Sequence, residues 1–219
     1  MDKAVTDYIL WFHEKRLDKS LSYRGHRILK NPMDLWNYQE IIYDQKIKYV
    51  IETGSLHGGS ATYFSDLLAN MGNDGKVITI DINPIIKKDG APFEIDPDGN
   101  IIAINASSSD PETLQTIKDI VAEDPGPILL ILDSDHRMPH VYDELCLFVP
   151  WLTNKDYLIV EDTIINGHPI RPDFGPGPYE AVVKYLEDYP RSLVADTTRE
   201  ERFGATQATK GYYRLPYNA

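Results

Sequence analysis

Short apolar runs alternate with amphipathic stretches along most of the chain. The runs have the length and composition of buried parallel strands, and they lie at 49–51, 77–80, 101–104, 128–132 and 157–160. Between them, apolar residues recur at helical spacing in the stretches 60–70, 112–122, 140–149 and 179–188. Strand–helix units repeated in this way predict a doubly wound α/β fold, with a mostly parallel sheet and helices on both faces.

Both ends of the chain extend this pattern. Two apolar segments near 193–196 and 211–215 are expected to complete a Rossmann-like sheet of seven strands, of which the last is antiparallel. At the other end, residues 4–17 carry apolar positions at helical spacing. Asn31-Pro32 then provides an N-cap and a first-turn proline, which predicts the start of a second helix.

The length of 219 residues suits one α/β domain with a sizeable core. We expect residues 46–219 to form this domain and residues 1–45 to form a helical extension packed on it. The net charge of −12 argues against nucleic acid or an anionic membrane as a partner. The single cysteine, Cys146, excludes an intrachain disulfide, and no segment resembles a signal peptide or a membrane span, so a cytoplasmic protein is expected.

Two loops are longer than a simple connection requires, and they cover residues 83–100 and 163–178. The second loop begins directly after Glu161-Asp162, at the carboxyl end of a predicted strand. Open α/β sheets bind their ligands at that edge. We therefore expect residues 163–178 to form a lid or one wall of the substrate site.

Carboxylates gather where two of the predicted strands end. Asp133 and Asp135 follow one apolar run, and Glu161 and Asp162 follow the next. If the two strands are neighbours, these like charges meet at one edge of the sheet, which is unfavourable unless a cation offsets them or their pKa values shift. A hard divalent metal is therefore the first hypothesis. The structural alternative is that Asp133 or Asp162 caps a helix or turn and that Glu161 pairs with a lysine or arginine.

The first predicted strand leads into a glycine-rich turn at residues 52–60, which suits a bound cofactor. The glycines lack the spacing of a dinucleotide fingerprint, and the acids around them suit S-adenosylmethionine better. In this interpretation Glu52 binds the methionine ammonium group, Ser60 binds its carboxylate, and Asp81 accepts from both ribose hydroxyls. Alternatively, the glycines only allow tight packing and Glu52 is a solvated strand end. The candidate cofactor-binding residues of the turn are Glu52, Gly54, Ser55, His57 and Ser60.

A run of serines follows the third strand of the core domain. In a nucleoside-binding fold this strand end passes the adenine, and Ser107 or Ser108 would bond the exocyclic amine of that base. The alternative is helix capping, because Ser109 and Asp110 directly precede Pro111. Asp110 suits the cap better than a ligand, whereas Ser107 and Ser108 remain candidates for the cofactor.

A series of short sequence motifs extends along the chain from about residue 20 to residue 215. They are Tyr23-Arg-Gly25, Lys30-Asn-Pro32, Gln39-Glu-Ile41, Glu52-x-Gly54 with Gly58-Gly-Ser60, Leu132-Asp-Ser-Asp-His136, Val160-Glu-Asp-Thr163, Asn166-Gly-His-Pro169 and Asp173-Phe-Gly-Pro-Gly-Pro178. Together they resemble the cephalosporin hydroxylase family, whose members are class I S-adenosylmethionine-dependent proteins. More distantly, the layout resembles the catechol O-methyltransferases.

The resemblance implies a magnesium-dependent O-methyltransferase fold and a homo-oligomer. It assigns the metal ligands to Asp135, Glu161 and Asp162. Asp133 competes for the first of these positions and is also counted among the cofactor-binding residues. The resemblance further places His136 beside the adenine, and it maps the cofactor turn onto Glu52, Gly54, Ser60 and Asp81, in agreement with the interpretation from the residues.

These observations predict methyl transfer from S-adenosylmethionine to a hydroxyl group of a sugar or small natural product. Mg²⁺ bound to the acceptor oxygen would lower the pKa of that hydroxyl. His136 and His168 are candidate general bases because histidine titrates near neutral pH. One alternative is a metal-dependent hydroxylase, although the carboxylates lack the histidine pair usual for non-haem iron. Another is a non-catalytic S-adenosylmethionine-binding partner protein, which would need no metal.

Overall fold

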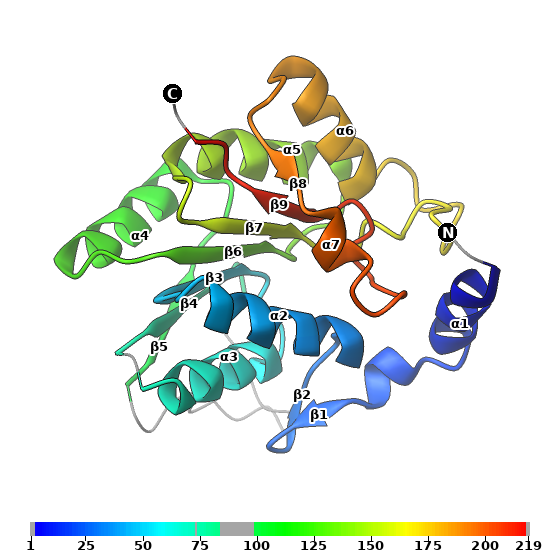
Figure 1. Cartoon of the computed structure of the whole chain (residues 1–219), viewed down its shortest axis with the longest axis horizontal. Coiled ribbons are helices and arrows are strands. Elements are labelled where there is room, and N and C mark those ends of the chain that lie inside the picture. The colour runs from blue at the N-terminus through cyan, green and yellow to red at the C-terminus, as the bar shows by residue number, and fades with distance from the viewer. Residues whose placement is uncertain (1–2, 73, 84–98, 218–219) are drawn as a thin grey trace.

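The computed structural model describes residues 3–72, 74–83 and 99–217, and its centre is a seven-stranded sheet (Figure 1). The strands lie in the order β5-β4-β3-β6-β7-β9-β8. Their bounds are β3 (Tyr49–Thr53), β4 (Lys76–Asp81), β5 (Ile101–Asn105), β6 (Ile128–Leu132), β7 (Tyr157–Val160), β8 (Val194–Ala195) and β9 (Tyr212–Arg214). All neighbouring pairs are parallel except those of β9, which runs antiparallel to both β7 and β8. The predicted Rossmann-like fold is confirmed.

Helices cover both faces of this sheet, as Figure 1 shows. One face carries α2 (Pro32–Asp44) and α3 (Gly59–Asn70), and the other carries α4 (Pro111–Glu123), α5 (Met138–Phe148) and α6 (Pro178–Asp188). The predicted caps are present: Asn31 accepts from the backbone N–H of Met33, and Asp110 accepts from that of Glu112, in each case ahead of a first-turn proline.

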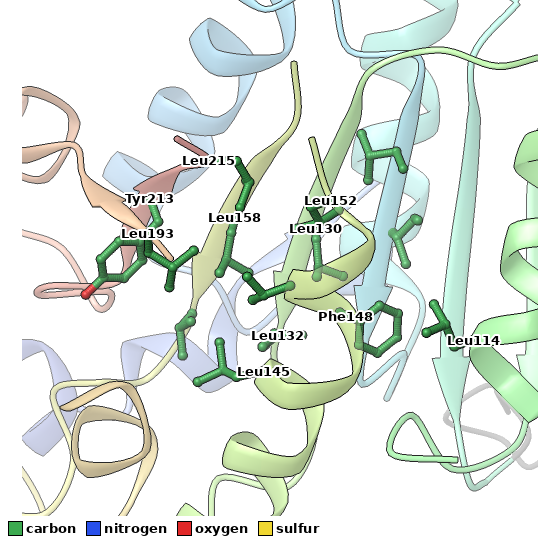
Figure 2. Close-up of a cluster of buried hydrophobic side chains, with 14 of the residues drawn as sticks. Leu114, Leu130, Leu132, Leu145, Phe148, Leu152, Leu158, Leu193, Tyr213 and Leu215 are labelled. Carbon is green, nitrogen blue, oxygen red and sulfur yellow. The ribbon is translucent and has the colours of Figure 1, made fainter. Parts of the chain in front are cut away.

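The strands are apolar on both sides because each face packs against helices. In the layer shown in Figure 2, Leu130 and Leu132 of β6 pack with Leu145 and Phe148 of α5. The alternate residues of β6 point the other way and join the core of α2 and α3, which includes Tyr38 and Phe64. This double burial explains why the strands read as unbroken apolar runs in the sequence.

The N-terminal segment contains elements that the periodicity did not predict. After α1 (Lys3–Glu14) come a short 3-10 helix, η1 (Leu17–Ser20), and a small hairpin of β1 (Ser22–Tyr23) and β2 (His26–Arg27). A second 3-10 turn, η2 (Val149–Trp151), and the short helix α7 (Thr197–Glu200) were also missed. The proposed boundary at residue 45 falls directly after α2 and stays a prediction.

The register of the central strands aligns their carboxyl ends. Thr53 of β3 pairs with Leu132 of β6, and Leu132 pairs with Val160 of β7. The next residue of each strand, among them Asp133 and Glu161, therefore lies in one row at the edge of the sheet. The strand order reverses at β3, and this switch point is where open α/β sheets bind ligands. Of the predicted loop 83–100, residues 84–98 lie outside the described part of the chain.

Candidate active site

A pocket of about 620 Å³ lies at the carboxyl edge of the sheet, over the switch point. It is bordered by the glycine-rich turn and by the ends of β4, β5, β6 and β7. Six of the predicted cofactor residues line it: Gly54, Asp81, Ser107, Ser108, Asp133 and His136. The geometry thus brings together residues from five segments that are far apart in the sequence, in a concave site large enough for a nucleoside cofactor.

Gly54 has a packing role as well as a place in the pocket wall. Its φ of +89° is unfavourable for other residues, and a Cβ here would lie 2.0 Å from the backbone oxygen of Asp133. A Cβ on Gly59 would likewise lie 2.1 Å from the backbone oxygen of Arg27. Both glycines therefore permit close backbone approach, so the tight-packing alternative describes part of what this turn does.

Asp81 is positioned by the backbone around it. Its Oδ2 accepts from the N–H of Leu56 at 3.0 Å, and its Oδ1 accepts from the N–H of Asn83 at 2.9 Å. These bonds fix the carboxylate at the pocket wall and leave further lone pairs on both oxygens. Ser107 and Ser108 stand at the end of the adjacent strand, and the Oγ of Ser108 lies 3.2 Å from Nε2 of His140.

Four of the predicted cofactor residues do not line the pocket. Glu52 is fully buried, and burial raises its pKa to about 7 against the opposing effect of Lys30. Ser60 hydrogen-bonds to Glu52, and Ser55 shares a 2.6 Å bond with Thr79. His57 is the fourth: its ring contacts a guanidinium group of the β1–β2 hairpin. Direct cofactor contacts for these four residues stay predictions.

A buried lysine pairs with three carboxylates at this edge of the sheet, the acid row of Glu52, Asp133 and Glu161. Lys30 is only 3% exposed, and its Nζ lies 2.5 Å from Oδ2 of Asp133, 3.0 Å from Oε1 of Glu161 and 3.7 Å from Oε1 of Glu52. Burial lowers the pKa of Lys30, but the three carboxylates outweigh it and raise this pKa well above its usual value. A single ammonium group therefore joins the ends of β3, β6 and β7.

Glu161 faces this lysine rather than the pocket. Its Oε1 also accepts from the hydroxyl of Tyr38 at 2.5 Å, and the side chain is 2% exposed. Burial raises the pKa of Glu161 to about 8, although Lys30 opposes the shift. The alternative considered from the sequence, that Glu161 pairs with a lysine, is what the structure shows. A metal-ligand role for Glu161 stays a prediction.

Among the described residues, one group of three side chains has the geometry to hold a metal ion: Asp133, His136 and Asp162. Nε2 of His136 lies 3.2 Å from Oδ1 of Asp133, and its Nδ1 lies 3.3 Å from Oδ2 of Asp162. Ligand atoms from the three residues all lie within 4.8 Å of one another. Burial lowers the pKa of His136, but the two carboxylates outweigh it and raise this pKa to about 9. The imidazolium therefore offsets a charge that a divalent cation would also offset, and the two carboxylates are suitable oxygen ligands.

Asp135 and His168 are engaged with other partners. Asp135 lines the pocket, but Nε of Arg137 donates to both of its oxygens, and this bonding lowers the pKa of Asp135 to about 2. His168 lies in the loop after β7, with its Nε2 2.9 Å from Oε1 of Glu180 and its ring stacked on Tyr179. His168 lines neither this pocket nor the cavity beside it. Their predicted roles, metal ligand and general base, stay predictions.

Sequence reasoning missed several polar residues at this site, and two of them, Lys30 and His140, contact other residues of the site. Lys30 belongs to a motif that carries the family resemblance, but no local pattern indicates that it contacts residues more than 100 positions away. His140, in the first turn of α5, lines the pocket and lies 3.0 Å from the Oγ of Ser134. Neither residue repeats a recognisable ligand spacing, so only the fold could reveal them.

The loop after β7 shapes a second cavity of about 440 Å³. This cavity shares Leu29, His136 and Asp162 with the first pocket, so the two spaces meet at the proposed metal group. Ile165 and Ile170 of the loop line this cavity, which agrees with the expectation that residues 163–178 form one wall of the substrate site.

Comparisons with known proteins agree with this architecture. The family model described as "Rhamnosyl O-methyltransferase/CmcI" matches residues 15–215. A rhamnosyl O-methyltransferase of Mycobacterium tuberculosis is 39% identical over 211 residues, which cover 96% of this chain and 84% of that protein. The Mycobacterium leprae counterpart is 40% identical over 96% of this chain and 90% of its own.

Solved structures show the same fold. An apo structure of CmcI superimposes with a TM-score of 0.70 and 24% identity, covering 92% of this chain and 78% of that one. A CmcI structure with Mg and S-adenosylmethionine gives 0.69 and 23%, covering 90% and 77%. None of the helices in the described residues combines the length and apolar character that a bilayer-spanning helix needs. The chain belongs to the rhamnosyl O-methyltransferase/CmcI family, as the resemblance to the cephalosporin hydroxylase family predicted, and it is an S-adenosylmethionine-dependent O-methyltransferase.

Proposed function

We propose that this enzyme transfers the methyl group of S-adenosylmethionine to a hydroxyl of a sugar or small natural product, with the help of Mg²⁺. The observation that carries this proposal is the junction of the two cavities at His136 and Asp162. A cofactor over the glycine-rich turn and an acceptor in the neighbouring cavity would meet there. The family relatives support the reaction class: those from Mycobacterium are rhamnosyl O-methyltransferases, and a CmcI structure carries Mg and S-adenosylmethionine.

The cofactor would lie along the 620 Å³ pocket. Asp81 would accept from the ribose hydroxyls with the lone pairs that its backbone bonds leave free. Ser107 and Ser108 stand where the adenine edge would lie, and Gly54 lets the cofactor approach the backbone closely. Glu52 would attract the methionine ammonium group from behind this wall, since its side chain is fully buried and bonded to Ser60.

The metal would bind beside the acceptor. We propose Asp133 and Asp162 as its protein ligands, with His136 adjacent, because their ligand atoms converge and because His136 and Asp162 lie at the junction of the cavities. The set read from the resemblance, Asp135, Glu161 and Asp162, shares one member with it. When bound, Mg²⁺ would stabilise the acceptor oxyanion and so favour loss of the hydroxyl proton.

His136 is the candidate base that lies at the reaction site. It is held between two carboxylates that fix its ring and favour its protonated form. It would accept a proton only after a bound cation offsets the charge of Asp133 and Asp162, which would lower the pKa of His136 toward its ordinary value. The site would therefore be primed for proton transfer by metal binding.

The ligand assignment is tested by paired substitutions. Asp133→Asn and Asp162→Asn should each lower Mg²⁺-dependent methyl transfer by about a hundredfold, since metal stabilisation of a developing oxyanion accounts for several kcal/mol. Asp135→Asn is the matched control and should cost much less, because its carboxylate is paired with Arg137. Calorimetric titration with Mg²⁺ and with S-adenosylhomocysteine separates lost metal binding from misfolding. Loss of Mg²⁺ binding in Asp135→Asn alone would instead support the set read from the resemblance.

The same protein distinguishes the alternative functions. Mass spectrometry of products from a panel of rhamnosides would show the gain of a methyl group for methyl transfer and of an oxygen atom for a hydroxylase. A non-catalytic partner protein would bind S-adenosylmethionine and yield neither product. The carboxylate-rich site favours methyl transfer, since non-haem iron sites use two histidines and one carboxylate.

A homo-oligomer and a cytoplasmic location complete the proposal. Leu10 and Trp11 on α1 are 43% and 48% exposed, and such apolar side chains on an outer helix support self-association. Light scattering after size-exclusion chromatography tests this: the Trp11→Glu variant should have a lower mass than the unsubstituted protein. A monomeric unsubstituted protein would contradict the expected oligomer.

A further inference from the structure

The second cavity is built by segments that the cofactor does not need. The end of α1 and η1 supply His13, Arg16, Asp18 and Lys19, and the loop after β7 supplies most of the opposite wall. Because the cavity meets the cofactor pocket at the proposed metal group, it is the space from which an acceptor hydroxyl would reach the methyl group. Its lining should therefore report the chemistry of the acceptor.

Three cationic side chains line this cavity without a carboxylate partner. Arg16, Lys19 and Arg171 form no ion pair within the described part of the chain, although the whole chain carries a net charge of −12. The guanidinium of Arg171 instead lies 4.9 Å from the centre of the Phe174 ring. In an acidic protein, a local group of unpaired cations attracts an anion that the rest of the surface repels.

The remaining lining suits a polyhydroxylated ring. Leu29, Ile165 and Ile170 provide an apolar surface, and Gln207 provides an amide. Oδ1 of Asp18 is buried and has no hydrogen-bond partner in the structure. A buried acceptor of this kind usually has a partner, and a ligand hydroxyl would supply one.

The backbone at the two arginines is in an uncommon conformation. Arg16 has a φ of 55° and Arg171 a φ of 48°, in the left-handed region that long side chains rarely adopt. Residues away from the cavity share this conformation, among them Arg191 with a φ of 70°. The backbone conformation therefore does not mark a ligand site, and the case for binding rests on the charges and the lining of the cavity.

We propose that the second cavity binds a phosphorylated sugar as the acceptor, with the sugar ring near Asp18 and Ile170 and the phosphate near Arg16, Lys19 and Arg171. A phosphate suits this group because it carries about two negative charges at neutral pH and three acceptor oxygens for the cationic donors. This inference rests on the proposed function and narrows its acceptor from any hydroxylated small molecule to one that carries a phosphate.

The test is calorimetry on the full chain saturated with S-adenosylhomocysteine. Three probes are titrated at low and high salt: rhamnose 1-phosphate, methyl rhamnoside and inorganic phosphate. The phosphorylated sugar should bind at least about tenfold more tightly than the neutral glycoside, and salt should reduce the difference. It should also bind more tightly than inorganic phosphate, because the ring adds contacts that the free ion lacks.

The variants Arg16→Gln and Arg171→Gln should each weaken rhamnose 1-phosphate binding by about tenfold and affect the neutral glycoside little. Arg191→Gln is the matched control, since Arg191 is also exposed with a positive φ of 70° but lines neither cavity. It should leave all three affinities unchanged. Equal affinities for the two sugars, or a preference that survives both arginine substitutions, would overturn the inference.

The proposed function and the identity of the acceptor are tested separately by these measurements. If S-adenosylhomocysteine itself does not bind the unsubstituted protein, the proposed function fails. If it binds and the preference for the phosphorylated sugar is absent, the methyltransferase proposal stands and only the acceptor inference is wrong. Binding of S-adenosylhomocysteine to each variant also shows that its fold is intact.

Discussion

At the scale of single residues, the fate of Glu161 shows what a sequence leaves open. The sequence placed four carboxylates at one edge of the sheet, and the fold confirms that neighbourhood. Which of them face a ligand depends on Lys30, which reaches the edge from a segment 103 residues before Asp133. The strand register also matters, because it aligns Asp133 with Glu161 and leaves Asp135 two residues beyond. Neither fact has a local signal.

Lys30 should be a stability determinant. Lys30→Met leaves Asp133, Glu161 and Glu52 without their common cation, and removal of one partner from a buried ionic group costs about 3–5 kcal/mol. Urea unfolding followed by circular dichroism measures the change. Lys48→Met is the control: Lys48 pairs with the exposed Asp124, so little change is expected. A Lys30→Met protein as stable as the unsubstituted chain would show that the acid row needs no internal cation.

His136 should make stability depend on pH. Its pKa in the folded protein, about 9, lies above its ordinary value of 6.5, so its contribution is complete below pH 6.5 and is lost as pH rises to 9. Glu52 and Glu161 also have raised pKa values and act in the same direction at lower pH. Thermal melts in a chelator should therefore show stability falling from pH 6.5 to 9.

In His136→Asn the part of that decline above pH 8 should become much smaller, since the raised pKa values of the two glutamates lie at or below about 8 and only the end of the Glu161 titration remains there. A proton NMR titration of the imidazole gives the pKa directly. An unshifted value near 6.5 would contradict the bridging geometry between Asp133 and Asp162.

At the scale of elements, the hydrophobic pattern predicted the sheet and its helices almost completely. The strands of the sheet are buried on both faces, so their apolar runs stand out, and prolines with N-cap residues mark the starts of α2 and α4. The β1–β2 hairpin was missed because each of its strands has two residues, too few to show alternation. The short helix α7 was missed because its four residues are too few to show helical periodicity.

Gly54 follows β3 directly and lines the pocket. Two alanine variants separate the effect of its close contact with Asp133 from the effect of its positive φ. Gly54→Ala and Gly175→Ala both place a side chain at a φ of +89°, which costs roughly 1–2 kcal/mol. Only the Cβ at position 54 meets a neighbour, the backbone oxygen of Asp133, while nothing lies within 4 Å at position 175. Gly54→Ala should therefore lose about 1–3 kcal/mol more in urea unfolding and weaken cofactor binding. Equal losses would show that β3 and β6 can separate freely.

At the scale of the whole molecule, the N-terminal segment and the loop after β7 pack together beside the second cavity. Ile9 of α1 is 2% exposed and packs in a cluster with Ile164, Ile165, Ile170 and Ala205, apart from the two cores of the sheet. The cofactor pocket uses none of these five residues, whereas the second cavity uses two. The residues of this cluster thus contribute to the second cavity and not to the first pocket.

Shortening a side chain in this cluster should weaken the binding of the acceptor but not that of S-adenosylhomocysteine. Ile9→Ala loosens the contact between α1 and the loop, so acceptor affinity should fall severalfold while S-adenosylhomocysteine affinity stays the same. Leu10→Ala, at the exposed neighbouring position, is the control and should change neither. Calorimetry with both ligands gives the answer, and a parallel loss of both affinities would mean that α1 supports the whole fold.

The wall formed by Leu29, His136 and Asp162 belongs to both cavities, and this has a consequence for the catalytic cycle. With the cofactor on one side and the acceptor on the other, each ligand would restrain side chains that the other touches, so the two binding events would share a coupling free energy. By thermodynamic reciprocity, whatever factor the cofactor imposes on acceptor affinity, the acceptor imposes on the cofactor. Substitutions at these three side chains would then change the affinity for both ligands and, with it, the strength of inhibition by the spent cofactor.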